Sequence, residues 1–187
     1  RYKEEIFAEM PEVDAIIGTG SVHEIVNAVK ALERGEKYTS LEDINQVALG
    51  GDRIVTTGEA FAYLKISEGC KNRCTYCAIP YLRGKFRSRP MDEIIAEAKE
   101  LCDMGIKELI VIGQDTTAYG IDLYGKYALA ELLRRLANET EVSWLRIMYC
   151  YPDKITDELL EEFKTNPKLV RYIDIPIQHI NDRILKK

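Results

Sequence analysis

Three cysteines stand close together in the chain with the spacing C-x3-C-x2-C: Cys70, Cys74 and Cys77. Thiolates are good ligands for zinc and for the iron of iron–sulfur clusters. A closed structural zinc site, or a cluster held only by cysteine, takes four protein ligands. No fourth cysteine or histidine stands near the triplet in the sequence. The triplet therefore predicts a metal centre that keeps one position open for another molecule.

Other interpretations of the triplet fit the sequence less well. The only histidines are His23 and His179, and neither completes the C-x2-C…H-x3-H pattern of a zinc site. A disulfide framework belongs to small secreted chains, whereas this chain has 187 residues and an odd count of 5 cysteines. Zinc completed by a distant ligand stays the alternative to an iron–sulfur cluster.

Composition places the chain among ordinary globular proteins, with 46% hydrophobic and 30% charged residues. No apolar run approaches the roughly 18 residues of a membrane-spanning helix. No secretory signal stands at the start of the sequence. We therefore expect a cytoplasmic chain whose cysteines are reduced and able to bind metal.

Positive charge is concentrated around the cysteines, although the net charge of the chain is −5. The stretch from Lys71 to Pro90 contains no acidic residue, and its basic residues are Lys71, Arg73, Arg83, Lys85, Arg87 and Arg89. Such a stretch suits an anionic substrate, a carboxylate or RNA phosphate, and it is equally typical of a solvated loop. The overall charge argues against a chain that is globally a nucleic-acid binder.

Predicted strands and helices alternate from residue 61 onward. The apolar patterns predict strands at 61–66, 107–113, 143–149 and 171–176. They predict helices at 90–104 and 126–138, a third capped by Thr156, and a fourth from His179 onward. This alternation indicates parallel βαβ units, so the fold class is α/β, as a partial (β/α) TIM-like barrel. Cys70 and residues 113–115, 149–150 and 176–179 follow strand ends, where barrel enzymes place their active sites.

The first 55 residues have a different pattern. A strand is predicted at 13–17, a capping box at Ser21–Glu24 opens a helix to about Arg34, and 36–51 resembles a polar linker. We therefore expect residues 1–55 to be the C-terminal tail of an N-terminal α/β domain plus a linker. Residues 56–187 are expected to form the (β/α) domain, truncated at its C-terminal end.

The cysteine spacing and its flanks resemble the signature of the radical S-adenosylmethionine superfamily. The resemblance implies that Cys70, Cys74 and Cys77 hold three irons of a 4Fe–4S cluster, and that the fourth iron binds S-adenosylmethionine. An electron from the cluster then releases a 5′-deoxyadenosyl radical, so the cofactor carries the difficult chemistry. Tyr76, directly before the last cysteine, matches the position that lies against the adenine.

Further motifs are similar to the methylthiotransferase branch of this superfamily. They are the stretches 66–70, 77–80, 83–84 and 88–89 and the run Gly-Gln-Asp-Thr-Thr-Ala-Tyr-Gly at 113–120. The resemblance implies a transferase that adds a methylthio group to the β-carbon of an aspartate in ribosomal protein 12 of the small subunit. Two alternatives stay open: the same chemistry on a tRNA adenosine, and a non-enzymatic iron–sulfur or metal module.

The resemblance also implies a set of cofactor-binding residues, and it assigns no catalytic residue beyond the cluster. Gly113, Gln114 and Asp115 match the loop that contacts the methionine amino group, and Gln178 lies at a strand end. For Asp115 the alternative is a turn residue that caps its own backbone. Arg146 alternates with apolar neighbours, so we expect it to point into the barrel and pair with a carboxylate.

Family members carry a second 4Fe–4S cluster on three cysteines of an N-terminal domain, yet residues 1–60 contain no cysteine. We therefore expect this chain to cleave S-adenosylmethionine without completing methylthiolation. Cys102 and Cys150 are interpreted as packing residues. The implied partners are the ribosomal protein and a reducing donor of the flavodoxin or ferredoxin type. No membrane is implied, and RNA contact is secondary.

Overall fold

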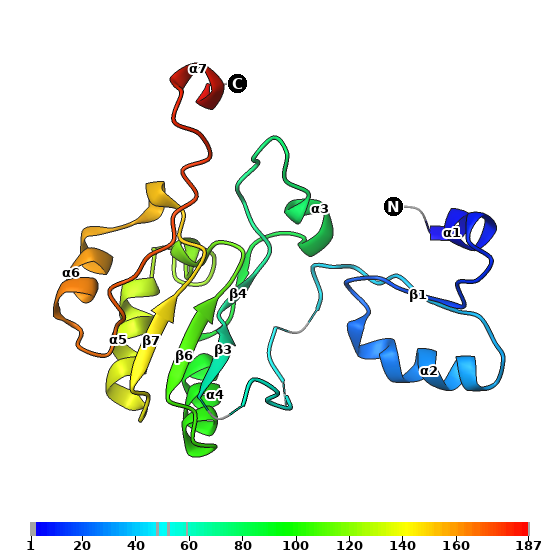
Figure 1. Ribbon diagram of the computed structural model, residues 1–187, viewed down its shortest axis with the longest axis horizontal. Coiled ribbons are helices and arrows are strands. Elements are labelled where there is room, and N and C mark those ends of the chain that lie inside the picture. Colours follow the sequence, from blue (N-terminus) through cyan, green and yellow to red (C-terminus); the bar gives the residue numbers. More distant parts are fainter. Residues whose placement is uncertain (1–2, 48, 52, 59, 187) are drawn as a thin grey trace. The chain divides into compact units, whose positions relative to one another are not determined.

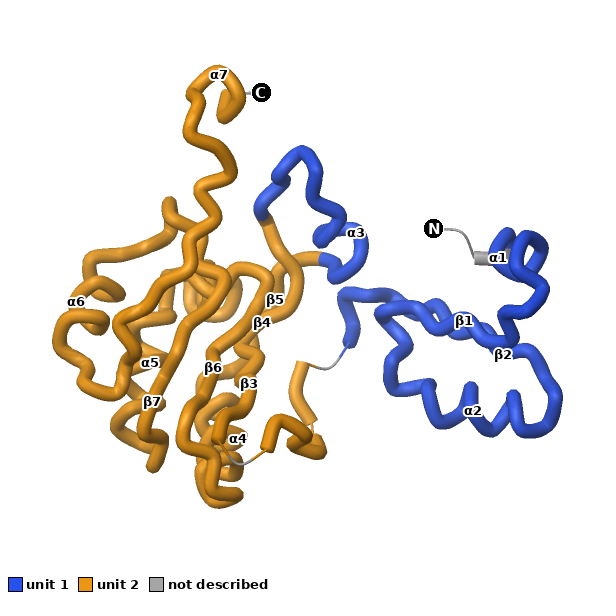
Figure 2. Tube along the Cα trace, in the orientation of Figure 1, with its two compact units in different colours: residues 1–48, 72–84 blue, residues 49–71, 85–187 orange. Residues whose placement is uncertain are grey.

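The computed structural model describes residues 3–47, 49–51, 53–58 and 60–186, which form two compact units. One unit comprises residues 1–48 and 72–84, and the other comprises residues 49–71 and 85–187 (Figure 2). Within the described part of the chain, no helix has both the length and the apolar character needed to cross a membrane.

The larger unit is built on a parallel sheet of the order β3-β6-β7 (Figure 1). Its strands are β3 (Phe61–Lys65), β6 (Glu108–Ile112) and β7 (Trp144–Ile147), with Leu109 beside both Ala62 and Leu145. One face of the sheet is buried, through Ala62, Leu64, Leu109, Val111, Leu145 and Ile147. The predicted α/β class is confirmed, and the sheet with its crossover helices is part of a (β/α) barrel.

Helices α4 (Met91–Asp103) and α5 (Leu129–Glu139) lie behind the sheet in Figure 1, and α6 (Asp157–Thr165) packs beside α5. Helix α4 begins after Pro90, carries two acidic residues in its first turn and is followed by Gly105 at φ 95°. The hydroxyl of Thr156 accepts a hydrogen bond from the Leu159 amide at 3.2 Å, so the predicted cap of α6 is confirmed.

The predicted strand at 171–176 is wrong. Only Leu169 forms a bridge to β7, opposite Leu145, and the chain then runs on without a ladder. Asp174 instead binds the residues that follow β7, because its carboxylate accepts from the Tyr149 amide at 2.7 Å and its carbonyl from the Cys150 amide at 3.2 Å. Pro176 has no amide hydrogen to continue a ladder.

Two helix starts also differ from the sequence prediction. Helix α5 begins at Leu129 rather than at 126, because Gly125 adopts φ 67° and the Ala128 amide donates to the Tyr119 carbonyl at 2.8 Å. Helix α7 (Asp182–Leu185) begins after Asn181, whose side chain accepts from the Arg183 amide. The helix predicted from His179 onward therefore starts later.

The smaller unit contains α1 (Lys3–Glu9), the parallel strands β1 (Ala15–Ile17) and β2 (Tyr38–Ser40), a 3₁₀ turn at Val22–Glu24, α2 (Ile25–Glu33) and α3 (Ile79–Arg83). The predicted capping box is wrong, because the Ser21 hydroxyl accepts from the Glu42 amide at 2.8 Å instead of capping the helix. Residues 38–40, interpreted as linker, form a strand.

A short antiparallel stem holds the ends of the cysteine loop. Strand β4 (Ser67–Glu68) pairs with β5 (Arg87–Ser88), and the sequence pattern predicts neither strand. Asp122 supports the stem, since its carboxylate accepts from both the amide and the hydroxyl of Ser88, at 2.9 and 2.7 Å. The loop 69–86 therefore leaves and re-enters the sheet at one fixed place.

Arg89 fixes this stem to the rest of the larger unit and is only 4% exposed. Its guanidinium donates to the Lys65 carbonyl at 2.7 Å and to the Glu97 carboxylate at 2.5 Å. Its own amide donates to the Ile66 carbonyl at 2.9 Å, and its carbonyl accepts from the Tyr119 hydroxyl at 2.9 Å. One residue thus joins the end of β3, helix α4 and the loop after β6.

The outer edge of β3 is capped by side chains. The carbonyls that point away from β6 are those of Phe61, Tyr63 and Lys65. They accept, in that order, from the Thr57 hydroxyl at 2.5 Å, the Arg53 guanidinium at 2.5 Å and the Arg89 guanidinium at 2.7 Å. These contacts satisfy backbone groups that an edge strand otherwise leaves open.

Replacing Leu133 of α5 with alanine is expected to lower the free energy of unfolding by about 2–5 kcal/mol, because its side chain is fully buried in the core. The matched control is Leu160→Ala on α6, whose side chain is 52% exposed and should cost less than about 1 kcal/mol. Urea unfolding followed by circular dichroism measures both, and equal losses would contradict this account of the core.

Candidate active site

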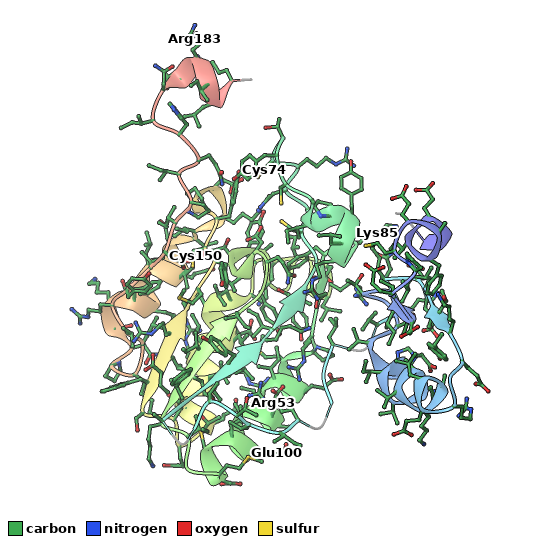
Figure 3. All side chains as sticks on the ribbon, turned by 45° about the vertical axis from the view of Figure 1, so that its right-hand side comes forward. Arg53, Cys74, Lys85, Glu100, Cys150 and Arg183 are labelled. Atoms are coloured by element: carbon green, nitrogen blue, oxygen red, sulfur yellow. The ribbon has the colours of Figure 1, made fainter. Side chains whose placement is uncertain are left out.

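The cysteine triplet lies in the loop between β4 and β5, and Figure 3 labels Cys74 in this loop. Cys70 directly follows Gly69, which adopts φ 77°, and the Cys77 amide donates to the Cys74 carbonyl at 2.9 Å. All three cysteines are half-buried. The boundary between the two units falls inside this loop, after Lys71. Their assignment to one metal site rests on their spacing along the chain.

The donor set fits an iron–sulfur cluster better than another metal. Soft thiolates suit iron–sulfur centres and zinc, and a 4Fe–4S cluster held by three cysteines keeps one iron without a protein ligand. The loop also carries Tyr76, whose side chain is 76% exposed. Among the described residues, the only group of His, Cys, Asp or Glu side chains close enough together to hold a metal ion is His23, Glu24 and Glu42, and it is largely exposed.

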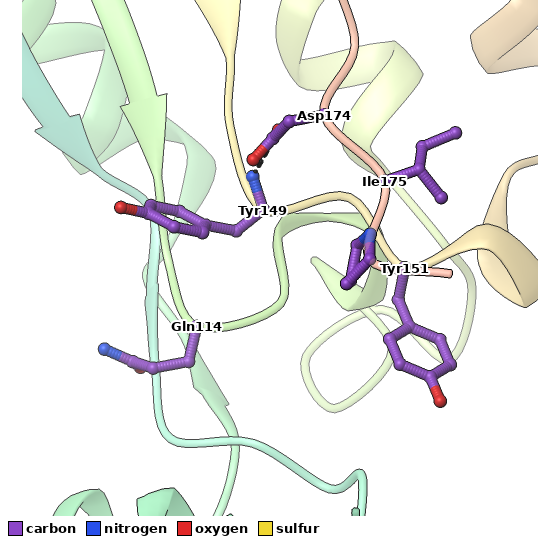
Figure 4. Close-up of a pocket in the computed structure, with 6 residues that line it drawn as sticks. Gln114, Tyr149, Tyr151, Asp174 and Ile175 are labelled. Atoms are coloured by element: carbon purple, nitrogen blue, oxygen red, sulfur yellow. Dashed lines mark hydrogen bonds between the residues drawn. The ribbon is translucent and has the colours of Figure 1, made fainter. Parts of the chain in front are cut away.

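A pocket of about 310 Å³ opens at the carboxyl edge of the sheet (Figure 4). It is lined by Gln114, Tyr149, Tyr151, Asp174, Ile175 and Pro176. These residues come from three successive connections, after β6, after β7 and after the Leu169 bridge. The structure thus brings the predicted Gln114 together with residues that follow the next strand, at the edge where barrel sites gather.

Polar contacts between the connections hold the pocket walls. Tyr149 adopts φ 64°, an uncommon conformation for a bulky residue, and its amide is fixed by the Asp174 carboxylate. Its carbonyl accepts from the Thr116 amide at 3.1 Å, and the Thr116 hydroxyl donates to the Met148 carbonyl at 2.8 Å. The connection after β6 therefore shapes the connection after β7.

Asp115 is 1% exposed and has partners on the protein. One carboxylate oxygen accepts from the Thr117 hydroxyl at 2.8 Å and from the Ala118 amide at 3.3 Å. The other accepts from the Lys154 ammonium at 2.5 Å. The alternative that Asp115 caps its own turn is confirmed, and its direct contact with a cofactor stays a prediction.

Arg146 forms the predicted pair with a carboxylate. Its Nε lies 2.5 Å from the Glu108 carboxylate on β6, and its guanidinium carbon lies 5.7 Å from the centre of the Tyr172 ring. Arg146 alternates with the buried Leu145 and Ile147 of β7, so its side chain projects from the sheet face opposite the helices. Its role toward a cofactor stays a prediction.

Gly113 and Gln178 occupy contrasting positions. Gly113 is buried at the end of β6, and a Cβ atom added there would come within 2.4 Å of the Ser67 hydroxyl oxygen, so a larger residue would have to displace that hydroxyl. Gln178 is exposed, with φ 63°. The neighbouring His179 accepts from the Asn181 amide through Nδ1 at 2.8 Å.

The two remaining cysteines have packing roles, as predicted. Cys150 is fully buried in the core, and its sulfur lies 3.8 Å from the Thr116 hydroxyl. Burial raises the pKa of the Cys150 thiol to about 11. Burial also raises the pKa of Cys102, which packs partly buried against the core. Because the folded pKa of Cys150 is raised, its contribution to stability is complete below the ordinary thiol pKa and is lost as pH rises through 11.

Three residues at or beside the pocket were missed by the sequence analysis: Tyr151, Lys154 and Asp174. Asp174 was placed inside a predicted strand, which hid its role at the pocket. Tyr151 and Lys154 follow β7 within a Tyr-Pro-Asp-Lys run, and position after a strand end was the available signal. The Lys154 contact spans 39 residues of sequence, which no local pattern reports.

The family model described as the Radical SAM superfamily matches residues 64–187. The chain therefore belongs to the radical S-adenosylmethionine superfamily, a class whose members use a 4Fe–4S cluster and S-adenosylmethionine.

The curated relatives that the chain matches are methylthiotransferases. The chain is 50% identical over 190 residues to the ribosomal protein uS12 methylthiotransferase RimO of Caldanaerobacter subterraneus subsp. tengcongensis, a match that covers 100% of the chain and 43% of the relative. It is 51% identical over 188 residues to RimO of Clostridioides difficile, covering 100% of the chain and 42% of the relative. These matches confirm the predicted resemblance, and the chain spans less than half the length of these relatives.

A solved structure supports the fold. The radical S-adenosylmethionine methyltransferase TsrM from Kitasatospora setae, with tryptophan substrate and an aza analogue of S-adenosylmethionine bound, superposes with a TM-score of 0.51 at 17% identity. The match covers 68% of this chain and 24% of TsrM. At this identity the likeness concerns the architecture alone.

The rate of alkylation should distinguish Cys74 and Cys77 from Cys150. At about pH 8, iodoacetamide is expected to modify Cys74 and Cys77 of the metal-free chain well before Cys150, since the thiolate is the reactive form and Cys150 is buried with a raised pKa. Peptide mass spectrometry over time gives the order. Denaturant is the control, because unfolding should make all the rates similar, and early modification of Cys150 in the folded chain would contradict the packing role.

Proposed function

We propose that this chain forms the S-adenosylmethionine-binding part of an enzyme that methylthiolates the β-carbon of an aspartate in ribosomal protein uS12. The observation that carries the proposal is the C-x3-C-x2-C triplet in the loop between β4 and β5, in a chain that belongs to the radical S-adenosylmethionine superfamily. The names of its relatives supply the substrate.

Cys70, Cys74 and Cys77 hold the 4Fe–4S cluster in this proposal. With S-adenosylmethionine bound at the open iron, and with an electron from the proposed donor, the cluster would supply radical chemistry that removes a hydrogen atom from carbon. An unactivated C–H bond has no usable acidity, so general acid–base catalysis is a poor route to the same product. The protein binds, orients and shields the reacting groups.

The proposed cofactor-binding residues are Tyr76, Gly113, Gln114, Asp115, Arg146 and Gln178. Support is strongest for Gln114, which lines the pocket. Its side-chain oxygen is buried and, among the described residues, has no hydrogen-bond partner. A buried acceptor without a partner is costly, and an ammonium group such as that of methionine would satisfy it. Gly113 directly precedes Gln114 and has no side chain, so a bound molecule could approach its backbone closely.

Residues 1–55 are proposed to be the tail and linker of a methylthiotransferase N-terminal domain, and residues 56–187 the radical domain. The second 4Fe–4S cluster, which supplies sulfur, needs cysteines that residues 1–60 do not contain. The proposed setting is the cytoplasm, with a flavodoxin- or ferredoxin-type electron donor.

A tRNA adenosine is the second candidate substrate, because several basic residues of the cysteine loop are exposed, among them Lys71, Arg73 and Arg83. Arg89 does not belong to such a surface, since it is buried against Glu97. The protein substrate is favoured by the identity to uS12-modifying relatives.

The cluster is tested by electron paramagnetic resonance of the anaerobically reconstituted, reduced chain. We expect a 4Fe–4S signal that changes when S-adenosylmethionine is added, because one iron has no protein ligand. Cys74→Ser should abolish the cluster, whereas the matched Cys102→Ser should retain it. A signal indifferent to S-adenosylmethionine, or stoichiometric zinc without iron, would contradict the proposed enzymatic function.

The substrate is tested by isotope transfer, which does not depend on the sulfur-donating cluster. With uS12 carrying aspartate deuterated at the β-carbon, deuterium is expected in the 5′-deoxyadenosine that the reduced, reconstituted chain releases. Mass spectrometry of the nucleoside reads the result, and uS12 with unlabelled aspartate is the control. Transfer from deuterated tRNA adenosine instead would favour the second candidate, and methylthiolated uS12 from this chain alone would contradict the need for a second cluster.

A further inference from the structure

An ion pair between Lys154 and Asp115 joins two of the connections that form the pocket. Asp115 lies in the connection after β6, and Lys154 lies in the 3₁₀ turn at Pro152–Lys154 after β7. The Lys154 ammonium is 2.5 Å from the Asp115 carboxylate. The side chains are 11% and 1% exposed, so the pair is screened little by solvent.

Each partner of this pair stands next to a residue of the pocket wall. Asp115 directly follows Gln114, and both Gln114 and Tyr151 line the pocket. The Lys154 ammonium also lies 4.4 Å from the centre of the Tyr151 ring, within the range of a cation–π contact. A displacement of Lys154 would therefore disturb both Gln114 and Tyr151, which line the pocket.

Thr117 transmits the position of Asp115 to the backbone of Tyr151. The Thr117 hydroxyl has one proton, which it donates to the Asp115 carboxylate at 2.8 Å. Its oxygen is then oriented to accept from the Tyr151 amide, which lies 3.0 Å away. A chain of polar contacts thus runs from Lys154 through Asp115 and Thr117 to the pocket wall.

We infer that Lys154 is a positioning residue for the cofactor pocket, acting through Asp115 and Thr117 to hold Tyr151 and Gln114 in place. The identity of the ligand rests on the proposed function, whereas the positioning itself concerns the protein alone. Buried ion pairs contribute little net stability compared with apolar packing, yet removing one partner disturbs the surroundings strongly. Such a pair matters because it holds binding groups in precise positions.

The pair of Arg134 and Glu162 provides a matched control. It joins α5 to α6 at 2.6 Å, and its carboxylate side chain is 8% exposed. Neither residue lines the pocket. Arg134→Met therefore removes a cation from a mostly buried carboxylate, as Lys154→Met does, without touching the pocket walls.

The experiment compares Lys154→Met, Lys154→Arg and Arg134→Met in the full chain by two measurements. Hydrogen exchange of the metal-free chain reports the Tyr151 amide, and calorimetric titration of the reconstituted chain with S-adenosylhomocysteine reports the pocket. Lys154→Met is expected to accelerate exchange at Tyr151 and to weaken binding, each on the order of tenfold. Lys154→Arg should restore most of the protection of the Tyr151 amide and most of the affinity. Arg134→Met should change neither the exchange rate nor the affinity, even if it lowers the thermal midpoint as much as Lys154→Met does.

Two results would overturn the positioning role: unchanged exchange and affinity in Lys154→Met, or equal losses in Arg134→Met. Failure of the proposed function has a different signature. In that case the unsubstituted reconstituted chain does not bind S-adenosylhomocysteine, while exchange at Tyr151 still decides whether Lys154 holds this wall.

Discussion

The ion pair between the buried Arg89 guanidinium and the Glu97 carboxylate is the interaction on which the geometry of this site depends. A charge taken out of water needs compensation from well-placed partners, and removing a partner from such a pair costs about 3–5 kcal/mol. Arg89 finds that compensation in the Glu97 carboxylate and the Lys65 carbonyl, which come from α4 and from the end of β3. Because these elements must meet around one side chain, both ends of the cysteine loop are fixed where the parallel sheet presents its carboxyl edge.

The pocket depends on a second kind of constraint, the mutual support of loops. Parallel strands bring successive connections to one edge, but the sheet alone does not give those connections a shape. Here each connection satisfies the polar groups of the next: Thr116 binds the backbone after β7, and Asp174 binds it from the other side. Tyr149 keeps a left-handed conformation within this lattice of contacts. An uncommon backbone conformation persists where several surrounding contacts hold it in place together.

The sequence predicts those features that local patterns encode. Apolar runs identify β3, β6 and β7, Thr156 identifies a cap, and cysteine spacing points to the loop proposed to hold the cluster. What it misses depends on distant partners. The two-residue strands β4 and β5 are too short for any periodicity to show. The Ser21 hydroxyl, placed as a cap, binds a backbone amide 21 residues away. Asp174 acts through its side chain in a segment whose apolar pattern resembles a strand.

The capped edge of β3 has a consequence for how this protein meets other molecules. Intermolecular strand pairing begins where a sheet exposes unused carbonyls, and this route leads to edge-to-edge aggregation. At β3 an incoming strand would have to displace Thr57, Arg53 and Arg89 from carbonyls they already occupy. The last of these would leave a buried cation short of a partner. Arg89, which holds the ends of the cysteine loop, thereby also helps to guard this edge of the sheet against strand pairing with another molecule.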